Sequence, residues 1–408
     1  MSRRIRLAFI LVYLTGGSLA AADWPQWRGP SGTGTTAETG LPVKWSATEN
    51  VAWKAPIGGL GVSTPIVVGD RVFVTSQLGA GIRQPGNHPR LVQGGNAAEA
   101  GERALGGSRT AALTQERTEF LIEAFHRTDG RRLWQYRLTA EGQMPGVHDK
   151  HNLASPSPVS DGQLVYAWFG TGQIVALDMS GKLVWQRHLG TEISPFNVIW
   201  GHSSSPALFG DTVILLCDHE PAAYLLAVDK RTGKQVWKAD RGKGRMSYST
   251  PLVVTPVFHD GVIYMSRGYR SSPYMAIRPG GRGDITKSHV VWESATGAPY
   301  ISSLVFHEGL IYMATDVGAV TVVEAESGQR VSQQRVEGVF SASPVAADGK
   351  VYFVSENGET IVMQAGRTPT VLARNDLGER AIASPAISNG QIFIRTDDHV
   401  FAIGQRRP

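Results

Sequence analysis

The phrase AVDKRTGKQVW at residues 227–237 decides the fold, because closely similar phrases stand at 176–185 (ALDMSGKLVW) and at 124–134 (AFHRTDGRRLW). In each copy an apolar strand ends at a polar turn, where a glycine supplies the positive φ that a tight hairpin needs. A tryptophan follows four residues after that glycine, on the outermost strand. A fourth copy at 323–328 keeps the turn and lacks the tryptophan. Self-similarity of this kind predicts a repeat architecture.

A second motif sets the period of the repeat. It consists of Ser or Thr followed by Pro, then apolar residues, a turn with Gly and Asp or Asn, and an alternating strand. These anchors stand at Ser63-Thr64-Pro65, Ser157-Pro158, Ser205-Pro206, Thr250-Pro251, Ser343-Pro344 and Ser384-Pro385, with a degenerate copy at Ser302-Ser303-Leu304. From Pro65 onward the spacings are 93, 48, 45, 53, 40 and 41 residues. The basic period is typical of a propeller blade with four strands.

Seven anchors predict an all-β fold, a seven-bladed β-propeller of four-stranded repeats, with eight blades as the alternative. A blade has two apolar faces, which are buried when blades stack around an axis. The repeat tryptophans are expected to fill the wedge between neighbouring blades. The last repeat stops after its third strand at 400–404, and the missing strand stands at 50–57. We therefore expect the N-terminal strand to complete the last blade without leaving an open edge.

The N-terminus predicts export. Three arginines precede an apolar run at 7–14, and small residues at 18–22 suit cleavage before Asp23. The run is too short to span a bilayer, so residues 1–22 are interpreted as a signal peptide. We expect a mature chain of one propeller domain, residues 23–408, that does not span the membrane and is periplasmic or secreted.

The charge and the cysteine content argue against a nucleic-acid-binding protein and against a fold stabilised by disulfides. The net charge of the full chain is +5, and the mature chain keeps about +2, which gives no reason to expect a nucleic-acid partner. Cys217 is the single cysteine, so no internal disulfide forms. Its apolar neighbours predict a buried, unreactive side chain.

The two motifs together resemble the repeat of pyrroloquinoline-quinone (PQQ) binding-like propellers, which occurs in the propeller lipoprotein of the outer-membrane β-barrel assembly machine. DWPQWRGP at 23–30 is similar to the mature start of many exported members. The resemblance implies the fold and makes PQQ with calcium a cofactor to test. The dehydrogenases that use it typically have eight blades, two vicinal cysteines and a calcium site of Glu, Asn and Asp. Cys217 alone cannot form that pair, and no calcium set is recognised here.

Candidate binding residues lie in the loops before the first strand and between the second and third strands of each blade, which are expected to open on one face. Loops on a rigid scaffold are where binding residues concentrate. The candidates are His148, His151, Asn152, Trp200, His202, Asp218, His219, Arg245, Tyr248 and Arg267.

Three interpretations of these residues stay open. They line a pocket for a small polar ligand, or they hold a transition metal, for which His151, His202 and His219 are the candidates. In the third interpretation, they only satisfy the loop backbone and the neighbouring blades. An insertion at about 79–118 in blade 1 emerges on the same face, and a lid and a loose excursion are both open for it.

The preferred function is a non-catalytic ligand-binding or protein-assembly scaffold in the cell envelope, whose top face recognises a protein partner or a small polar ligand. The first alternative is a PQQ-dependent oxidoreductase with Trp200 stacking on the quinone and Arg245 holding a carboxylate. The second is a metal-dependent enzyme that uses the His-rich face. The chain contains no Walker loop, His-Glu-x-x-His or Gly-x-Ser-x-Gly motif, which favours the non-catalytic interpretation.

Overall fold

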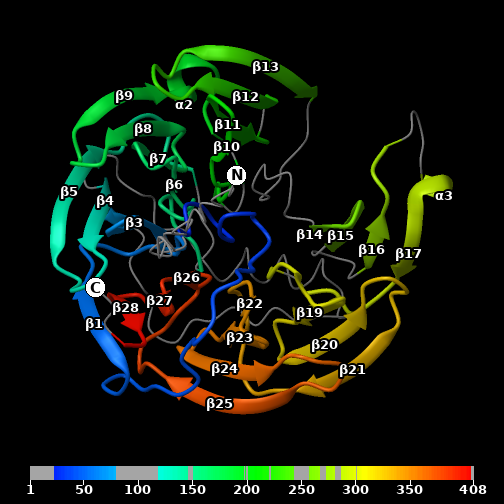
Figure 1. The fold of residues 1–408 in the computed structure, drawn as a ribbon. Coiled ribbons are helices and arrows are strands. Elements are labelled where there is room, and N and C mark those ends of the chain that lie inside the picture. The colour runs from blue at the N-terminus through cyan, green and yellow to red at the C-terminus, as the bar shows by residue number, and fades with distance from the viewer. Residues whose placement is uncertain are drawn as a thin grey trace, which may run out of the picture.

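A computed structural model of the chain shows seven four-stranded antiparallel sheets arranged in a ring (Figure 1). This confirms the seven-bladed propeller, and the alternative of eight blades is wrong. The structure describes residues 23–79, 118–145, 150–196, 198, 201–219, 222–242, 257–266, 273–280, 286–299 and 301–405. The expected signal peptide and residues 80–117 of the expected insertion lie outside this set.

Blades 1 to 3 follow one another along the chain. Their strands are β2 (Ile66–Val68), β3 (Arg71–Leu78), β4 (Glu119–His126) and β5 (Arg132–Thr139) in blade 1; β6 (Val159–Ser160), β7 (Leu164–Trp168), β8 (Gln173–Asp178) and β9 (Leu183–His188) in blade 2; and β10 (Ala207–Phe209), β11 (Thr212–Cys217), β12 (Ala223–Asp229) and β13 (Gln235–Gly242) in blade 3. A short helix, α2 (Leu189–Glu192), follows blade 2.

Blades 4 to 7 repeat the same order. Their strands are β14 (Val257–His259), β15 (Val262–Ser266), β16 (Tyr274–Ile277) and β17 (Val290–Ser294) in blade 4; β18 (Val305–His307), β19 (Leu310–Ala314), β20 (Ala319–Glu324) and β21 (Arg330–Arg335) in blade 5; β22 (Val345–Ala347), β23 (Lys350–Val354), β24 (Glu359–Gln364) and β25 (Thr370–Asp376) in blade 6; and β26 (Ala386–Ser388), β27 (Gln391–Arg395) and β28 (His399–Ile403) in blade 7. A second short helix, α3 (Thr286–His289), precedes β17.

The N-terminal strand closes the ring, as expected. β1 (Val51–Pro56) pairs antiparallel with β28, and Trp53 lies opposite Ala402. Blade 7 therefore takes three strands from the C-terminus and one from the N-terminus. Because both chain ends share one sheet, the ring cannot open there without breaking a complete strand pairing.

The repeat tryptophans join neighbouring blades, as expected. Trp185 of blade 2 donates its Nε1–H to Lys230 O of blade 3 at 2.8 Å. A Cβ added to Gly233 would lie 2.6 Å from the Trp185 ring, so only glycine admits the ring at this hairpin. Trp53, Trp134 and Trp292 make the same contacts to the following blade. Each ring therefore fills the wedge between two blades and satisfies its own polar atom.

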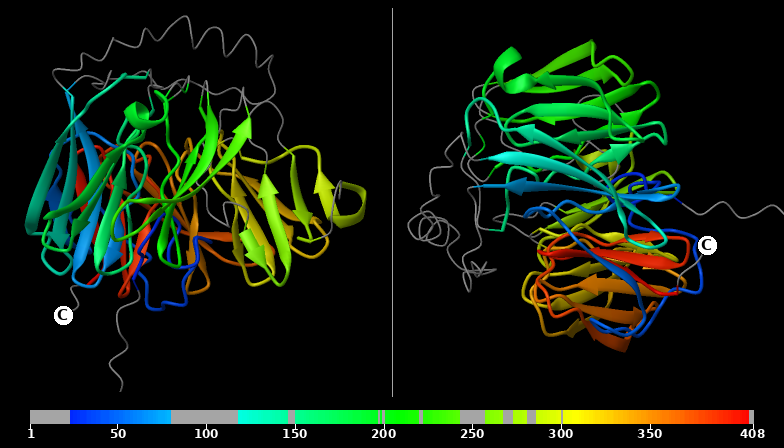
Figure 2. Two further views of the ribbon diagram at one scale, coloured as in Figure 1. Left: turned by 90° about the horizontal axis from the view of Figure 1, so that it is seen from above. Right: turned by 90° about the vertical axis from the view of Figure 1, so that its left-hand side faces the viewer.

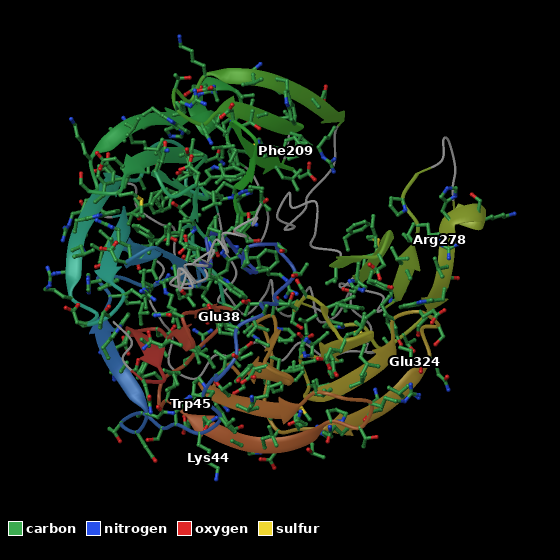
Figure 3. The ribbon with its side chains drawn as sticks, in the orientation of Figure 1. Glu38, Lys44, Trp45, Phe209, Arg278 and Glu324 are labelled. Atoms are coloured by element: carbon green, nitrogen blue, oxygen red, sulfur yellow. The ribbon has the colours of Figure 1, made fainter. Side chains whose placement is uncertain are left out.

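Trp237 of blade 3 differs from the others, because its side chain is 39% exposed. In blade 4, β16 and β17 are separated by residues 278–289 rather than by a short hairpin, and the described part of this connection has no glycine in contact with Trp237. The apolar clusters of the described residues join the other neighbouring blades, and none of them contains residues of both blade 3 and blade 4. Phe209, labelled in Figure 3, is also exposed on blade 3.

The Ser/Thr-Pro anchors form a hydrogen-bonded chain around the axis. In each observed link, the backbone N–H of one anchor donates to the serine hydroxyl of the next blade's anchor. The links run from Thr64 to Ser157 (2.9 Å), Ser157 to Ser205 (2.9 Å), Ser303 to Ser343 (3.0 Å) and Ser343 to Ser384 (2.9 Å). In each link, the serine hydroxyl of one blade accepts the anchor N–H of the preceding blade, so the anchors connect neighbouring blades near the axis.

The segment before β1 crosses the bottom face, which carries the turns between first and second strands (Figure 2). Trp24 is fully buried and pairs with Val67 of blade 1. The buried guanidinium of Arg28 donates to Leu304 O at 2.5 Å and to Pro344 O at 3.4 Å, which ties blades 5 and 6. Glu38 then accepts hydrogen bonds from the turn between β26 and β27 of blade 7 (Figure 3). Burial lowers the pKa of Arg28 to about 9, so the residue stays charged at neutral pH.

Candidate functional site

The opposite, top face carries the loops that contain the candidate residues. His151, Asn152, His202, Asp218 and His219 belong to the described residues. The other candidates lie outside them, and their roles stay predictions: His148, Trp200, Arg245, Tyr248 and Arg267.

His202 and His219 lie in a buried aromatic cluster between blades 2 and 3. Both side chains are fully buried. Phe196 stacks on His219 with ring centroids 4.2 Å apart, and Trp168 lies 4.2 Å from the His202 ring. Burial lowers the pKa of His202 to about 3, and the electrostatic effects of His219 and His151 lower it further. His202 is therefore a neutral ring in an apolar setting at physiological pH.

The loop that leads into blade 2 is held by its own polar side chains. Asn152 Nδ2 donates to Leu60 O of blade 1 at 2.9 Å, and its Oδ1 accepts from Ala154 N at 3.0 Å. His151 Nδ1 lies 2.7 Å from Ser155 Oγ. These contacts fit the interpretation in which the polar candidates support the loops, although they leave a ligand role for His151 and Asn152 open.

Asp218 makes a bidentate ion pair with Arg241. The Nε and Nη2 atoms of Arg241 lie 2.7 Å and 3.2 Å from the carboxylate oxygens of Asp218. Among the described residues, no group of three or more His, Cys, Asp or Glu side chains is placed to hold a metal ion. The described histidines therefore come near one another without forming a ligand set, and Asp218 is already engaged.

Sequence reasoning missed a set of carboxylates at one position of the repeat. Each lies six residues after the first residue of a blade's second strand: Asp218, Asp316, Glu356 and Asp397, in blades 3, 5, 6 and 7. A sequence pattern could have revealed them, because a hydroxyl residue followed by a carboxylate recurs at Thr315-Asp316, Ser355-Glu356 and Thr396-Asp397. Their partners come from distant parts of the chain, which the repeat pattern does not reveal.

A buried ion pair joins two distant blades across the interior of the ring. Lys150 Nζ lies 2.6 Å from Glu356 Oε1, and both side chains are buried. Ser341 Oγ also donates to this carboxylate. Lys150 stands in the loop leading into blade 2, whereas Glu356 belongs to blade 6. Removing one member of such a pair is strongly destabilising, because the other charge is then buried alone.

Asp316 of blade 5 is the least compensated of the four carboxylates. Burial raises its pKa to about 7, against the opposing effects of Lys150 and of backbone amides at Asp316 and Ile301. The negative charge of Glu356 raises it further. Asp316 and Glu356 are thus both buried near the ammonium group of Lys150.

With this geometry established, comparison with known proteins identifies the family. The sequence profile described as outer membrane protein assembly factor BamB matches residues 30–194, 90–316, 284–371 and 318–405, which together span most of the chain. The chain belongs to this family. The resemblance to PQQ-like propellers such as the one in the outer-membrane assembly machine is therefore confirmed.

Single relatives are more distant. The outer membrane protein assembly factor BamB of Yersinia pestis is 21% identical over 308 residues, which cover 70% of this chain and 72% of the relative. A europium-containing methanol dehydrogenase superposes with a TM-score of 0.56 at 12% identity, covering 91% of this chain and 89% of that protein. The quinohemoprotein alcohol dehydrogenase of Comamonas testosteroni gives 0.53 at 11% identity, covering 95% and 81%. At these identities, the two dehydrogenases share the propeller fold alone.

The described residues do not supply the groups that PQQ and calcium would need. Trp200 and Arg245, the expected quinone contacts, lie outside the described set. Asp218 and Glu356 already carry basic partners, and no cluster of ligands is placed for a metal within the same residues. We therefore derive no chemical step through this cofactor.

None of the described helices of this BamB-family chain is both long and apolar enough to cross a lipid bilayer.

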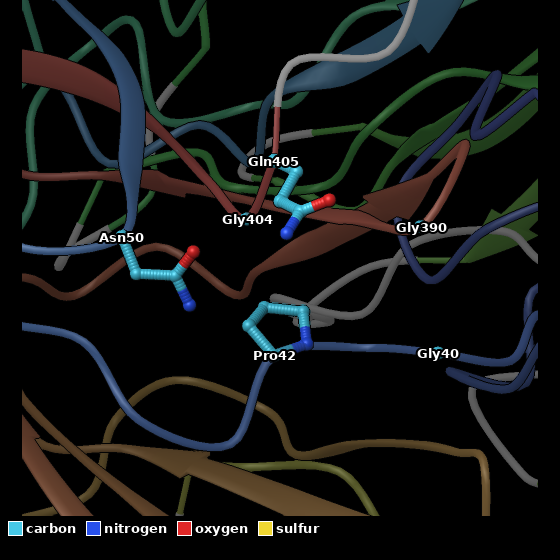
Figure 4. A pocket seen from close by; sticks show the side chains of 6 residues that line it. All are labelled: Gly40, Pro42, Asn50, Gly390, Gly404 and Gln405. Carbon is cyan, nitrogen blue, oxygen red and sulfur yellow. The ribbon is translucent and has the colours of Figure 1, made fainter.

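A small pocket lies where the N-terminal segment meets blade 7, lined by Gly40, Pro42, Asn50, Gly390, Gly404 and Gln405 (Figure 4). Its only polar side chains are two amides, so it offers no charged group to a ligand.

Proposed function

We propose that this protein is exported to the cell envelope and serves there as a scaffold for protein assembly, with its top face as the contact surface for a protein partner. The family's description names outer-membrane protein assembly, and the Yersinia relative carries the same name. The arginine-rich and apolar start of the chain supports export before Asp23.

The observation that carries the proposal is the packing of the described candidate residues at the top face. The Lys150–Glu356 pair spans the ring there, and His202 and His219 are packed among aromatic rings. A cofactor site would need an open, concave pocket with polar groups free to meet the ligand. Paired and packed side chains instead support recognition by the exposed surface above them. We therefore favour a protein partner over a small polar ligand.

A deletion strain tests this function. Loss of the gene is expected to lower the amount of folded β-barrel protein in the outer membrane, and the full chain should restore it when expressed with its signal segment. Fractionation should place the mature protein in the envelope. Unchanged amounts of folded barrel proteins in the deletion strain would contradict the assembly role, and recovery of the protein in the cytoplasm would contradict export.

A further inference from the structure

Asp316 differs from the three carboxylates that occupy the same position in other blades. Asp218 pairs with Arg241 at 2.7 Å, Glu356 with Lys150 at 2.6 Å, and Asp397 with Arg380 at 3.7 Å. Asp316 is 2% exposed, and neither of its carboxylate oxygens has a hydrogen-bond partner of normal geometry among the described residues. Burial of a carboxylate without good hydrogen bonds is costly, because the group loses its contacts with water.

Three exposed apolar side chains lie in the top-face loops of blades 5 and 6 that carry Asp316 and Glu356 or contact them. Ile301, Val317 and Val339 are 47%, 43% and 40% exposed, and we call them the blade-5 patch. Val317 follows Asp316 directly, and the backbone amide of Ile301 favours the charged form of that carboxylate. Val339 O accepts a hydrogen bond from Glu356 N at 2.8 Å. Ile301 and Val317 therefore lie beside Asp316, and Val339 lies beside Glu356.

The position of Val317 is apolar in blade 5 and polar in blades 6 and 7. The positions equivalent to Val317 in blades 6 and 7 are Asn357 and Asp398, which are polar. The loop carrying Val317 is held against the segment leading to Val339, since Val336 N donates to Gly318 O at 2.7 Å. Apolar side chains beside a buried carboxylate that lacks a hydrogen-bond partner suit a ligand that is apolar along its length and positive at its end.

We propose that Asp316 and the blade-5 patch receive a lysine or arginine side chain, flanked by apolar residues, from the protein partner. The aliphatic stem would pack on Ile301 and Val317, and its charged end would pair with the Asp316 carboxylate. Because Asp316 is 2% exposed, the incoming side chain reaches it only if the side chains that cover it move. This inference rests on the proposed function and specifies what its contact surface recognises.

The test uses the full mature chain and two synthetic peptides. Both carry the apolar-basic segment Leu-Lys-Leu between Gly-Ser ends, except that the second has Gln in place of Lys. The Lys peptide is expected to bind about ten-fold more tightly in calorimetric titrations, as one partly buried charge pair would give. Asp316→Asn should remove this preference. Asp397→Asn, which changes the same position of blade 7, should keep it.

A second pair of variants addresses the patch without touching a charge. Val317→Ser should weaken the Lys peptide several-fold, whereas Val371→Ser, at a position of similar exposure on the outer strand of blade 6, should not. Equal binding of the Lys and Gln peptides, absence of binding by both, or an unchanged preference in Asp316→Asn would overturn the inference.

The outcome can be separated from that of the proposed function. If the deletion strain loses folded barrel proteins and Asp316→Asn restores them fully, the assembly role stands and the basic side chain is not recognised here. If the deletion has no effect while the Lys peptide still binds through Asp316, the recognition site stands and the assembly role does not.

Discussion

Replacing Trp185 by alanine tests the physical basis of the ring, because Trp237 offers a matched control within the same protein. Trp185 is 8% exposed, rests on the Gly233 hairpin and donates to Lys230 O. Truncating a buried tryptophan costs about 3–5 kcal/mol of unfolding free energy, since it leaves a cavity between two blades. Trp237 is 39% exposed and has no hairpin seat, so Trp237→Ala should cost about 1 kcal/mol or less.

The assay is equilibrium unfolding in urea followed by far-UV circular dichroism, which does not depend on the mutated fluorophore. Unfolding midpoints and slopes should be compared, because a change of slope would signal that the blades no longer unfold together. Trp185→Phe should fall between the two alanine variants, because it keeps an aromatic ring and leaves Lys230 O without its donor, at about 1–2 kcal/mol. Equal losses of unfolding free energy in Trp185→Ala and Trp237→Ala would refute the role of the buried tryptophan rings in holding neighbouring blades together.

Further predictions concern the charged interior and the cofactor. Arg28→Met should cost about 2–4 kcal/mol and speed proteolysis of the N-terminal segment, because buried carbonyls of blades 5 and 6 lose their charged donor; unchanged melting and cleavage would contradict this. Lys150→Met should cost about 3–5 kcal/mol by leaving Glu356 buried without its partner, and adding Glu356→Gln should recover part of the loss in thermal melts. The raised pKa of Asp316, about 7, means that the folded state holds a proton that the unfolded chain releases near pH 3.8. Stability should therefore fall as pH rises from about 4 to 7, by at most about 4 kcal/mol. Asp316→Asn should remove that slope. Incubation with PQQ and calcium should leave no retained chromophore and no dye-linked alcohol oxidation, and either signal would revive the oxidoreductase interpretation.

The blade number and the ring closure could be predicted because both depend on local patterns. The Ser/Thr-Pro anchors and the Gly-x-x-x-Trp phrase mark single blades, and the Trp53 strand was recognisable as the piece missing from the last repeat. The same local patterns do not predict the exposure of Trp237. The sequence phrase around Trp237 is regular, but burial of its ring depends on the hairpin of the next blade. In blade 4 the longer connection at residues 278–289 stands in place of that hairpin.

The site was harder to predict, because it depends on contacts between blades. His202 and His219 stand in polar-looking loops, and only the structure shows Trp168 and Phe196 packed around them. Lys150 and Glu356 are 206 residues apart, so no spacing rule could pair them. The position of Asp316 follows from the repeat, whereas its lack of a described basic partner depends on which loops reach it.

The most direct test of the account is site-specific photo-cross-linking in living cells. A photoreactive residue in place of Val317 on the top face should give discrete adducts with an envelope protein. The same residue in place of Val371, on the outer strand of blade 6 and of similar exposure, should give none. Adducts of the same kind from both positions, or none from Val317, would contradict the claim that the top face of this propeller binds a protein partner.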